Sequence, residues 1–184
     1  MPTELEQLAA TAAGCTDCEL CENRSTVVFG MGNPQARLMF VGEGPGAEED
    51  KQGLPFVGRS GQLLDKLVLE ELGITRGHCY IANVVKCRPP GNRDPKPDEI
   101  DSCRPYLDGQ VDLIAPEVIV TLGKFAAQLL LDSSETIGRL RGREHEFRTG
   151  VLIPTYHPAY VLRGGGESMA RMRADLIRAK RVLS

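Results

Sequence analysis

Four short apolar segments, separated by segments of helical periodicity, constrain the fold of this chain more than any other feature. They cover residues 36–42 (ARLMFVG), 79–87 (CYIANVVKC), 116–123 (PEVIVTLG) and 151–156 (VLIPTY). Strands that alternate with helices form a parallel sheet that helices cover on both faces. We therefore expect an α/β fold: a three-layer α/β/α domain over residues 1–184 with a central four-stranded, mainly parallel sheet.

Helix signals fall between and after these strands. Thr3 and Glu6 form a possible capping box for a first helix, Ser60 is expected to cap a helix that stops at Gly73, and helical patterns also occupy residues 98–114, 123–131 and 167–183. The segment 141–158 reads as a hairpin whose second arm is the fourth strand. Two long loops, at 42–61 and 88–99, remain, and loops of that length inside a compact domain are usually functional.

Hydropathy predicts where the protein is located, whereas its charge says little about its partners. The N-terminus MPTELEQLAATAAG does not resemble a signal peptide, and no apolar run is long enough to cross a bilayer. We expect a cytoplasmic protein with no membrane contact. The net charge is −3, but residues 160–184 contain six basic and two acidic side chains. This basic segment could contact phosphates, although a solvated helix face explains the charges equally well.

The carboxyl ends of the predicted strands collect the most reactive residues. Ligands of parallel sheets bind beyond these ends, and here they carry Gly42-Glu43-Gly44, Asn83 and His157. The GEGPG segment lacks the spacing of a dinucleotide loop and the Lys-Ser/Thr of a P-loop. Its acidic residues, Glu43 and Glu49 among them, suit activating water or stabilising a cationic sugar, with a solvated surface turn as the alternative.

Three further side chains could complete a binding site at this rim. Phe56 could stack on a flat ring, the amide of Asn83 could both donate to and accept from the edge of a pyrimidine, and His157 could donate to developing negative charge. Each could equally be an ordinary structural residue. After His157, an exposed hairpin with Val161 and Leu162 at its apolar tip could wedge into a base stack while Arg163 takes a phosphate.

Six cysteines require a separate explanation. Cys15, Cys18 and Cys21 are separated by two residues each, Cys79 lies in a strand, and Cys87 and Cys103 are separated by fifteen residues. Disulfides are disfavoured in the cytoplasm. Four thiolates from two distant segments could hold zinc or a [4Fe–4S] cluster, and the wide spacing favours the cluster. Spacing alone leaves open whether Cys21 is a ligand.

Five blocks in the same order resemble the family 4, iron–sulfur uracil-DNA glycosylases. They are CTDC, GEGPG with AEED, PFVGRSGQLL, YIANVVKCRPP and HPAYVLR, which together span most of the chain. The resemblance implies a uracil-DNA glycosylase-like fold, a [4Fe–4S] cluster on Cys15, Cys18, Cys87 and Cys103, and Cys21 and Cys79 as spare thiols. It also implies a prokaryotic, nucleoid-associated enzyme, expected as a monomer, that acts on uracil in single- or double-stranded DNA; a replication or repair partner stays unknown.

The same resemblance assigns roles to single residues. Gly42 and Gly44 belong to the substrate-binding motif; Phe56 would stack on the extruded uracil and Asn83 would read its Watson–Crick edge. His157 would stabilise the leaving group, and Glu43 would position water and stabilise the sugar cation. Glu49 would lie near the C5 edge and help exclude the methyl of thymine.

Two alternative functions are weighed against a glycosylase. A related group binds uracil-DNA covalently without turnover, through a histidine after the second strand. The segment RPPGNRDPKPDE contains no histidine, which favours a true enzyme that hydrolyses the N-glycosidic bond and leaves an abasic site. An electron carrier or redox sensor would have no need of Glu43, Asn83 and His157.

Overall fold

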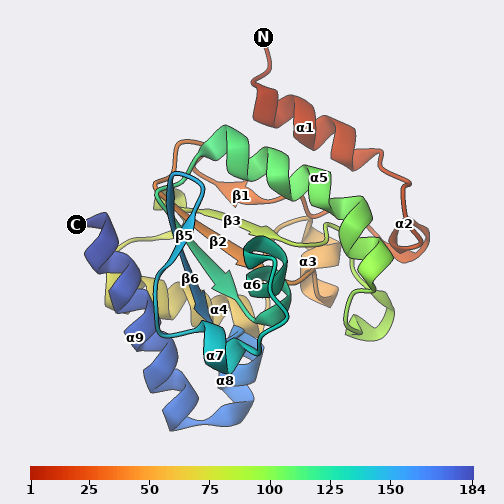
Figure 1. Cartoon of the computed structure of the whole chain (residues 1–184). Coiled ribbons are helices and arrows are strands. Elements are labelled where there is room, and N and C mark those ends of the chain that lie inside the picture. The colour runs from red at the N-terminus through yellow and green to blue at the C-terminus, as the bar shows by residue number, and fades with distance from the viewer.

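A six-stranded, mostly parallel sheet forms the centre of the molecule in the computed structural model, which describes residues 1–184 (Figure 1). The strands are β1 (Met31–Gly32), β2 (Leu38–Gly42), β3 (Tyr80–Asn83), β4 (Val118–Leu122), β5 (His145–Phe147) and β6 (Gly150–Thr155). Their order is β1-β3-β2-β4-β6-β5. The four inner strands run parallel, and β1 and β5 pair antiparallel at the two edges.

The helices cover both faces of this sheet. They are α1 (Glu4–Ala13), α2 (Leu20–Asn23), α3 (Ala47–Gln52), α4 (Arg59–Leu67), α5 (Pro97–Ile114), α6 (Lys124–Leu131), α7 (Ile137–Leu140), α8 (Pro158–Gly164) and α9 (Gly166–Leu183), with one π turn at Val68–Leu72 and 3₁₀ turns at Arg76–His78 and Pro90–Asn92. No helix combines the length and the apolar character that a membrane crossing requires.

Two hydrophobic cores lie on opposite faces of the sheet. On one face, α4 and α9 pack against Phe40, Val120 and Ile153. On the other face, α5 and α6 pack against Met39 and Ile119. Neighbouring residues of a strand thus point to opposite cores, which explains why the inner strands appear in the sequence as continuous apolar runs. The layered α/β architecture predicted from the sequence is confirmed.

The predicted number of strands was wrong, because the sheet has six strands and not four. The two additional strands are short edge strands with two and three residues. They are only partly buried, so they lack the apolar pattern that marks the inner strands. The hairpin at 141–158 is confirmed, and its first arm is β5.

Three local predictions need correction. The loop at 42–61 contains the short helix α3, which has no apolar period to reveal it. Gly58, and not Ser60, is the N-cap of α4. The segment after His157 is the helix α8 rather than a hairpin, because Pro158 occupies its first turn and His157 caps it. The Thr3–Glu6 capping box is present, and Gly73 ends the helical segment in the left-handed conformation with φ 72°.

Candidate functional site

A cavity of about 590 Å³ opens at the carboxyl ends of the inner strands. Most of the residues predicted for the site line it, namely Glu43, Gly44, Glu49, Phe56, Asn83, His157 and Arg163. They come from the ends of β2, β3 and β6, from α3 and the loop between α3 and α4, and from α8. The parallel register brings these ends together, because Val84 N–H donates to the Gly42 carbonyl at 2.9 Å and Val85 N–H donates to the Glu43 carbonyl at 3.1 Å.

The floor of the cavity depends on a glycine. Gly42 does not line the cavity, but a Cβ atom there would lie 2.5 Å from both the Asn83 Oδ1 and the Phe56 Cζ atoms. No side chain fits at that distance. Gly42 therefore allows the amide of Asn83 and the ring of Phe56 to approach each other across the end of β2.

Asn83 carries an unsatisfied acceptor. The residue is 1% exposed, and its Oδ1 has no hydrogen-bond partner. A buried acceptor without a partner costs about 1–3 kcal/mol. Because Asn83 lines the cavity, this acceptor is available to a water molecule or a ligand donor there. The backbone carbonyl of the same residue accepts a hydrogen bond from Lys86 Nζ at 2.7 Å.

Lys86 is itself fully buried, and the sequence did not reveal its role. Its Nζ also donates to Gln110 Oε1 at 2.5 Å, and burial lowers its pKa to about 7. Gln110 in turn donates to the Phe29 carbonyl at 2.8 Å. The polar network behind β3 therefore fixes the backbone carbonyl of Asn83 at the end of the strand, where the residue lines the cavity.

Phe56 is held in an unusual backbone conformation. Its φ is 52°, a left-handed value that costs a residue with a side chain about 1–2 kcal/mol. The residue is 5% exposed, and the centroid of its ring lies 5.8 Å from the centroid of the His157 ring. The ring thus forms one wall of the cavity, next to the histidine.

His157 presents a single free donor. Its Nδ1 accepts the Ala159 N–H at 3.1 Å, so the ring proton lies on Nε2. Burial, with the nearby positive charge of Arg163, lowers the pKa of His157 to about 4. The imidazole is therefore neutral at pH 7, and its Nε2–H can donate to a ligand. Gly123, with φ 96°, leaves room for it, because a Cβ atom there would lie 3.1 Å from His157 Cβ.

Glu43 is a poised carboxyl group. Burial raises its pKa to about 7, Asp94 adds a repulsive charge, and Lys124 opposes the rise. Lys124 Nζ and Asp94 Oδ2 lie 3.7 Å apart in an exposed ion pair. Neither partner was predicted from the sequence, because both lie far from Glu43 along the chain. A carboxyl group with a pKa near neutrality can exchange protons or orient water at physiological pH.

Glu49 has most of its bonding capacity occupied by backbone donors. Its Oε1 accepts from Val57 N–H at 3.0 Å and from Gly58 N–H at 2.9 Å, and its Oε2 accepts from Gly46 N–H at 3.1 Å. The carboxylate lines the cavity but also ties α3 to the loop that carries Phe56. No pattern in the sequence indicated this second connection.

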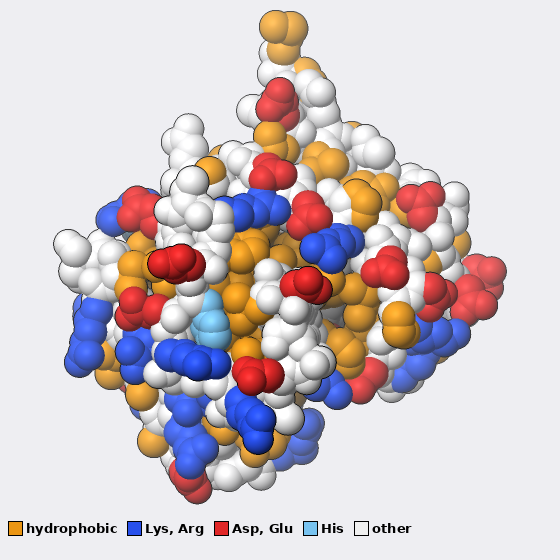
Figure 2. Space-filling model, viewed as in Figure 1, with side chains coloured by type: hydrophobic (Ala, Val, Ile, Leu, Met, Phe, Trp, Pro, Cys, Tyr) orange, Lys and Arg blue, Asp and Glu red, His pale blue; other side chains and the backbone are white.

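The helix α8 divides the predicted DNA-contacting residues. Val161 is 2% exposed and belongs to the core, while Leu162 is 44% exposed. The apolar tip predicted as an exposed Val161-Leu162 hairpin is therefore wrong for Val161, because the helix turns it inward. Figure 2 shows Lys and Arg side chains on the lower part of the molecule, where α7, α8 and the lower half of α9 lie in Figure 1.

Five of the six cysteines, all but Cys79, lie near one another around Cys87 in the loop after β3. Burial raises the pKa of the Cys87 thiol, and Cys18 and Cys15 lie near enough to add to the rise. Cys103 lies in turn near Cys87 and Cys18. Arg24 donates to Cys87 Sγ at 3.5 Å, and Lys86 N–H donates to Cys103 Sγ at 3.4 Å. No three Cys, His, Asp or Glu side chains converge on a point that one metal ion could occupy.

Comparison with known proteins agrees with this geometry. Residues 29–179 match the family model of the uracil DNA glycosylase superfamily. A type-4 uracil-DNA glycosylase of Thermotoga maritima is 46% identical over 96% of this chain and 93% of its own length. One from Sulfurisphaera tokodaii is 44% identical over 86% of this chain and 76% of its own length. The chain belongs to the type-4 uracil-DNA glycosylase family.

A uracil-DNA glycosylase of another type is also similar to this chain, at lower identity and over a smaller share of it. A type-5 uracil-DNA glycosylase of Thermus thermophilus is 34% identical over 69% of this chain and 62% of its own length. The family model and the type-4 relatives confirm the resemblance that the five sequence blocks of this type-4 glycosylase indicated.

Proposed function

We propose that the protein removes uracil from DNA by hydrolysing the N-glycosidic bond, which leaves an abasic site for base excision repair. The observation that carries this proposal is the buried, unpartnered Oδ1 of Asn83 in a cavity whose other walls are the Phe56 ring and the neutral His157 donor. An acceptor, an aromatic wall and a donor in this arrangement suit a flat heterocycle with an N–H group.

Uracil has to leave the base stack to reach this cavity. Phe56 then stacks on the ring, and Asn83 Oδ1 accepts the N3–H of uracil, which completes its missing hydrogen bond. Cytosine has no hydrogen on N3, so the same atom disfavours it. The methyl group of thymine would have to fit at the C5 edge, near Glu49, where the loop is tied down by three backbone hydrogen bonds.

Bond breaking separates charge, and two residues stabilise the two products of that separation. The electron pair of the glycosidic bond passes to the uracil ring, and His157 Nε2–H donates to its O2. The sugar becomes cationic, and the Glu43 carboxylate stabilises it and orients the water that attacks C1′. One preorganised donor of this kind is worth roughly 3–4 kcal/mol in the transition state.

Contacts to the DNA come from the rim of the cavity. Arg163 lines the cavity and has no carboxylate partner among the ion pairs of the molecule, so it is available to a phosphate. Leu162 is exposed beside it and takes the place that the extruded base leaves in the stack. Val161 supports this wedge from the core.

The cysteine group is proposed to hold a [4Fe–4S] cluster through Cys15, Cys18, Cys87 and Cys103. The donor set fits, because a cluster takes one thiolate at each iron and two of these sulfurs already accept N–H donors. When bound, the cluster supplies a structural cross-link between the segment after α1 and the loop that follows β3. That loop includes Asp94 and borders the cavity.

Excision from a labelled oligonucleotide with one uracil, followed by alkali, tests the function. We expect multiple turnovers by the wild-type protein and losses of about 10²–10³-fold in Glu43→Ala and His157→Ala. His145→Ala and Glu146→Ala on β5, remote from the cavity, serve as controls. A uracil-dependent complex that resists denaturant and yields no abasic product would instead indicate a binding protein.

A further inference from the structure

The conformation of Phe56 needs support from its surroundings. A phenylalanine with φ 52° has left the regions that side chains prefer, and such a conformation persists only when neighbouring groups fix it. The first turn of α4 supplies part of this support. A Cβ atom on Gly61 would lie 1.8 Å from the Phe56 carbonyl oxygen, so the helix backbone packs directly against that peptide group.

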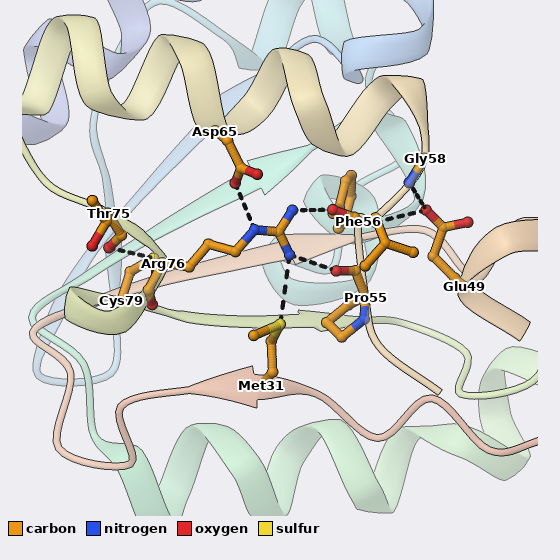
Figure 3. Close-up of polar contacts among 10 residues, drawn as sticks. Met31, Glu49, Pro55, Phe56, Gly58, Asp65, Thr75, Arg76 and Cys79 are labelled. Carbon is orange, nitrogen blue, oxygen red and sulfur yellow. Dashed lines mark hydrogen bonds and ion pairs between the residues drawn. The ribbon is translucent and has the colours of Figure 1, made fainter. Parts of the chain in front are cut away.

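Arg76 supplies the rest from the opposite end of the sheet. It stands just before β3, and its guanidinium reaches across to the Phe56 loop (Figure 3). Nη1 donates to the Pro55 carbonyl at 2.8 Å, and Nη2 donates to the Phe56 carbonyl. Nε donates to Asp65 Oδ1 at 2.6 Å, which anchors the guanidinium on α4. The Arg76 side chain is 19% exposed.

The peptide group between Phe56 and Val57 is therefore held at both ends by ionised side chains. Arg76 binds its carbonyl, and Glu49 binds its N–H at 3.0 Å (Figure 3). Hydrogen bonds to charged groups are stronger than those between neutral groups. A peptide plane fixed from two sides leaves the Phe56 side chain little freedom to change direction.

We propose that Arg76 is a positioning residue, which sets the ring of Phe56 as the stacking surface for the extruded base. The inference rests on the proposed function and deepens it. Only an arginine fork can serve two successive carbonyls and a carboxylate together, because a lysine presents a single point of charge. Arg76 does not touch the base, so its effect has to pass through Phe56.

A second possibility is that Arg76 only stabilises the fold through Asp65. The two roles differ in their dependence on Phe56. A positioning role disappears when the ring is absent, whereas a stabilising role does not. Double-mutant cycles measure this dependence directly.

The experiment compares uracil excision by Arg76→Lys and Arg76→Met proteins, each with the natural Phe56 and with Phe56→Ala. We expect kcat/KM to fall about 10-fold for Arg76→Lys and about 100-fold for Arg76→Met, since small errors of placement cost up to about that much. Inhibition by free uracil should weaken in parallel. In combination with Phe56→Ala, the same substitutions should change kcat/KM less than about 3-fold.

Arg148→Met is the matched control, because Arg148 makes a comparable double ion pair with Asp108 and Asp112 away from the cavity. It should lower the melting temperature and leave excision unchanged. All assays are run well below the lowest melting temperature, and Arg76→Lys keeps the positive charge should Arg76→Met fold poorly.

Equal losses with and without Phe56→Ala, or wild-type rates in both Arg76 variants, would overturn the inference while leaving the proposed function standing. A wild-type protein that releases no uracil would overturn the proposed function itself. The two failures are therefore distinguishable in one series of assays.

Discussion

The rings of Phe56 and His157 lie next to each other, with 5.8 Å between their centroids and 34° between their planes. Phe56 comes from the loop before α4, and His157 comes from the junction of β6 and α8. Since the Nδ1 of the histidine is bound to Ala159 N–H, its free Nε2–H is the donor that remains for a base stacked on Phe56. The stacking surface and the hydrogen-bond donor therefore form one unit.

Adding a single methyl group at Gly42 should disable this unit. In Gly42→Ala the new Cβ would lie 2.5 Å from Asn83 Oδ1 and from Phe56 Cζ, so both side chains have to move. We expect kcat/KM for uracil excision to fall about 100-fold or more. Steady-state assays on a single-stranded substrate measure the change.

Gly166→Ala is the control for this substitution. Gly166 begins α9, and a Cβ atom there would meet nothing within 4 Å. It should keep wild-type activity. A Gly42→Ala protein with full activity would mean that the close approach of Asn83 and Phe56 is not needed for catalysis.

The activity should rise with pH as Glu43 loses its proton. Burial, helped by Asp94, raises the pKa of Glu43 to about 7, and the carboxylate is the form that stabilises the sugar cation. His157, with a pKa lowered to about 4, stays neutral throughout this range. We expect log kcat/KM to increase with a slope of about one up to about pH 7 and then to level off.

Two charge variants should move this profile in opposite directions. Asp94→Asn removes a charge that raises the pKa of Glu43, so the midpoint shifts to lower pH. Lys124→Met removes a charge that lowers it, so the midpoint shifts to higher pH. A profile that is unchanged in both variants would contradict the assignment of the titration to Glu43.

The same group affects stability with a defined sign. The pKa of Glu43 is about 7 in the folded protein and 4.5 in an exposed carboxyl. The folded state therefore binds the proton more tightly, and stability falls as pH rises from about 4.5 to about 7. Glu43→Gln should consequently raise the free energy of unfolding at about pH 8 and change it little at about pH 4. Urea denaturation at the two pH values measures this difference.

Much of the site could be predicted because its residues follow the inner strands directly. Apolar runs define β2, β3 and β6 in the sequence, and parallel topology places their carboxyl ends together. Glu43, Asn83 and His157 therefore fall into one cavity as a consequence of chain order alone. Phe56 could be added because an apolar aromatic stood out in a polar loop.

The remaining parts had no signal in the sequence. Arg76 acts through the backbone carbonyls of Pro55 and Phe56, and Lys86 acts through the backbone carbonyl of Asn83. Any peptide offers such carbonyls. The helices α3 and α8 are short, and their ends are set by Gly46 and His157 rather than by an apolar period. Val161 reads as exposed in a hairpin and is buried in a helix, since the rotation of a helix decides which side chains face inward.

Truncation of Leu162 should lower the rate of uracil excision more on duplex DNA than on single-stranded DNA. Leu162 is 44% exposed on α8, and a wedge is needed only where a base has to be replaced in a stack. In Leu162→Ala we expect excision from duplex DNA to fall about 10-fold more than excision from a single strand. The same oligonucleotide, with and without its complement, provides the comparison. Equal losses on both substrates would contradict the wedge.

The cysteine-to-alanine variants should divide into two groups by the iron content of the purified protein. We expect the wild-type protein to carry about four iron atoms per chain with visible absorption, and the Cys87→Ala and Cys103→Ala proteins to lose both. The matched control is Cys79→Ala, because Cys79 is buried to a similar extent, at 1% exposed against 5% for Cys103. Its thiol lies near the Thr75 and Arg76 carbonyls, away from the other sulfurs, so this variant should retain its iron.

The comparison of these variants separates a cofactor effect from a packing effect. Removing a buried sulfur costs stability at any of these positions, but only a cluster ligand should change the iron content. Loss of iron should also loosen the segment after β3, because Cys87 and Cys103 border the turn that carries Asp94. Proteolysis within residues 88–96 should then be faster in Cys103→Ala than in Cys79→Ala. Equal iron content in the two variants would contradict the proposed ligand set.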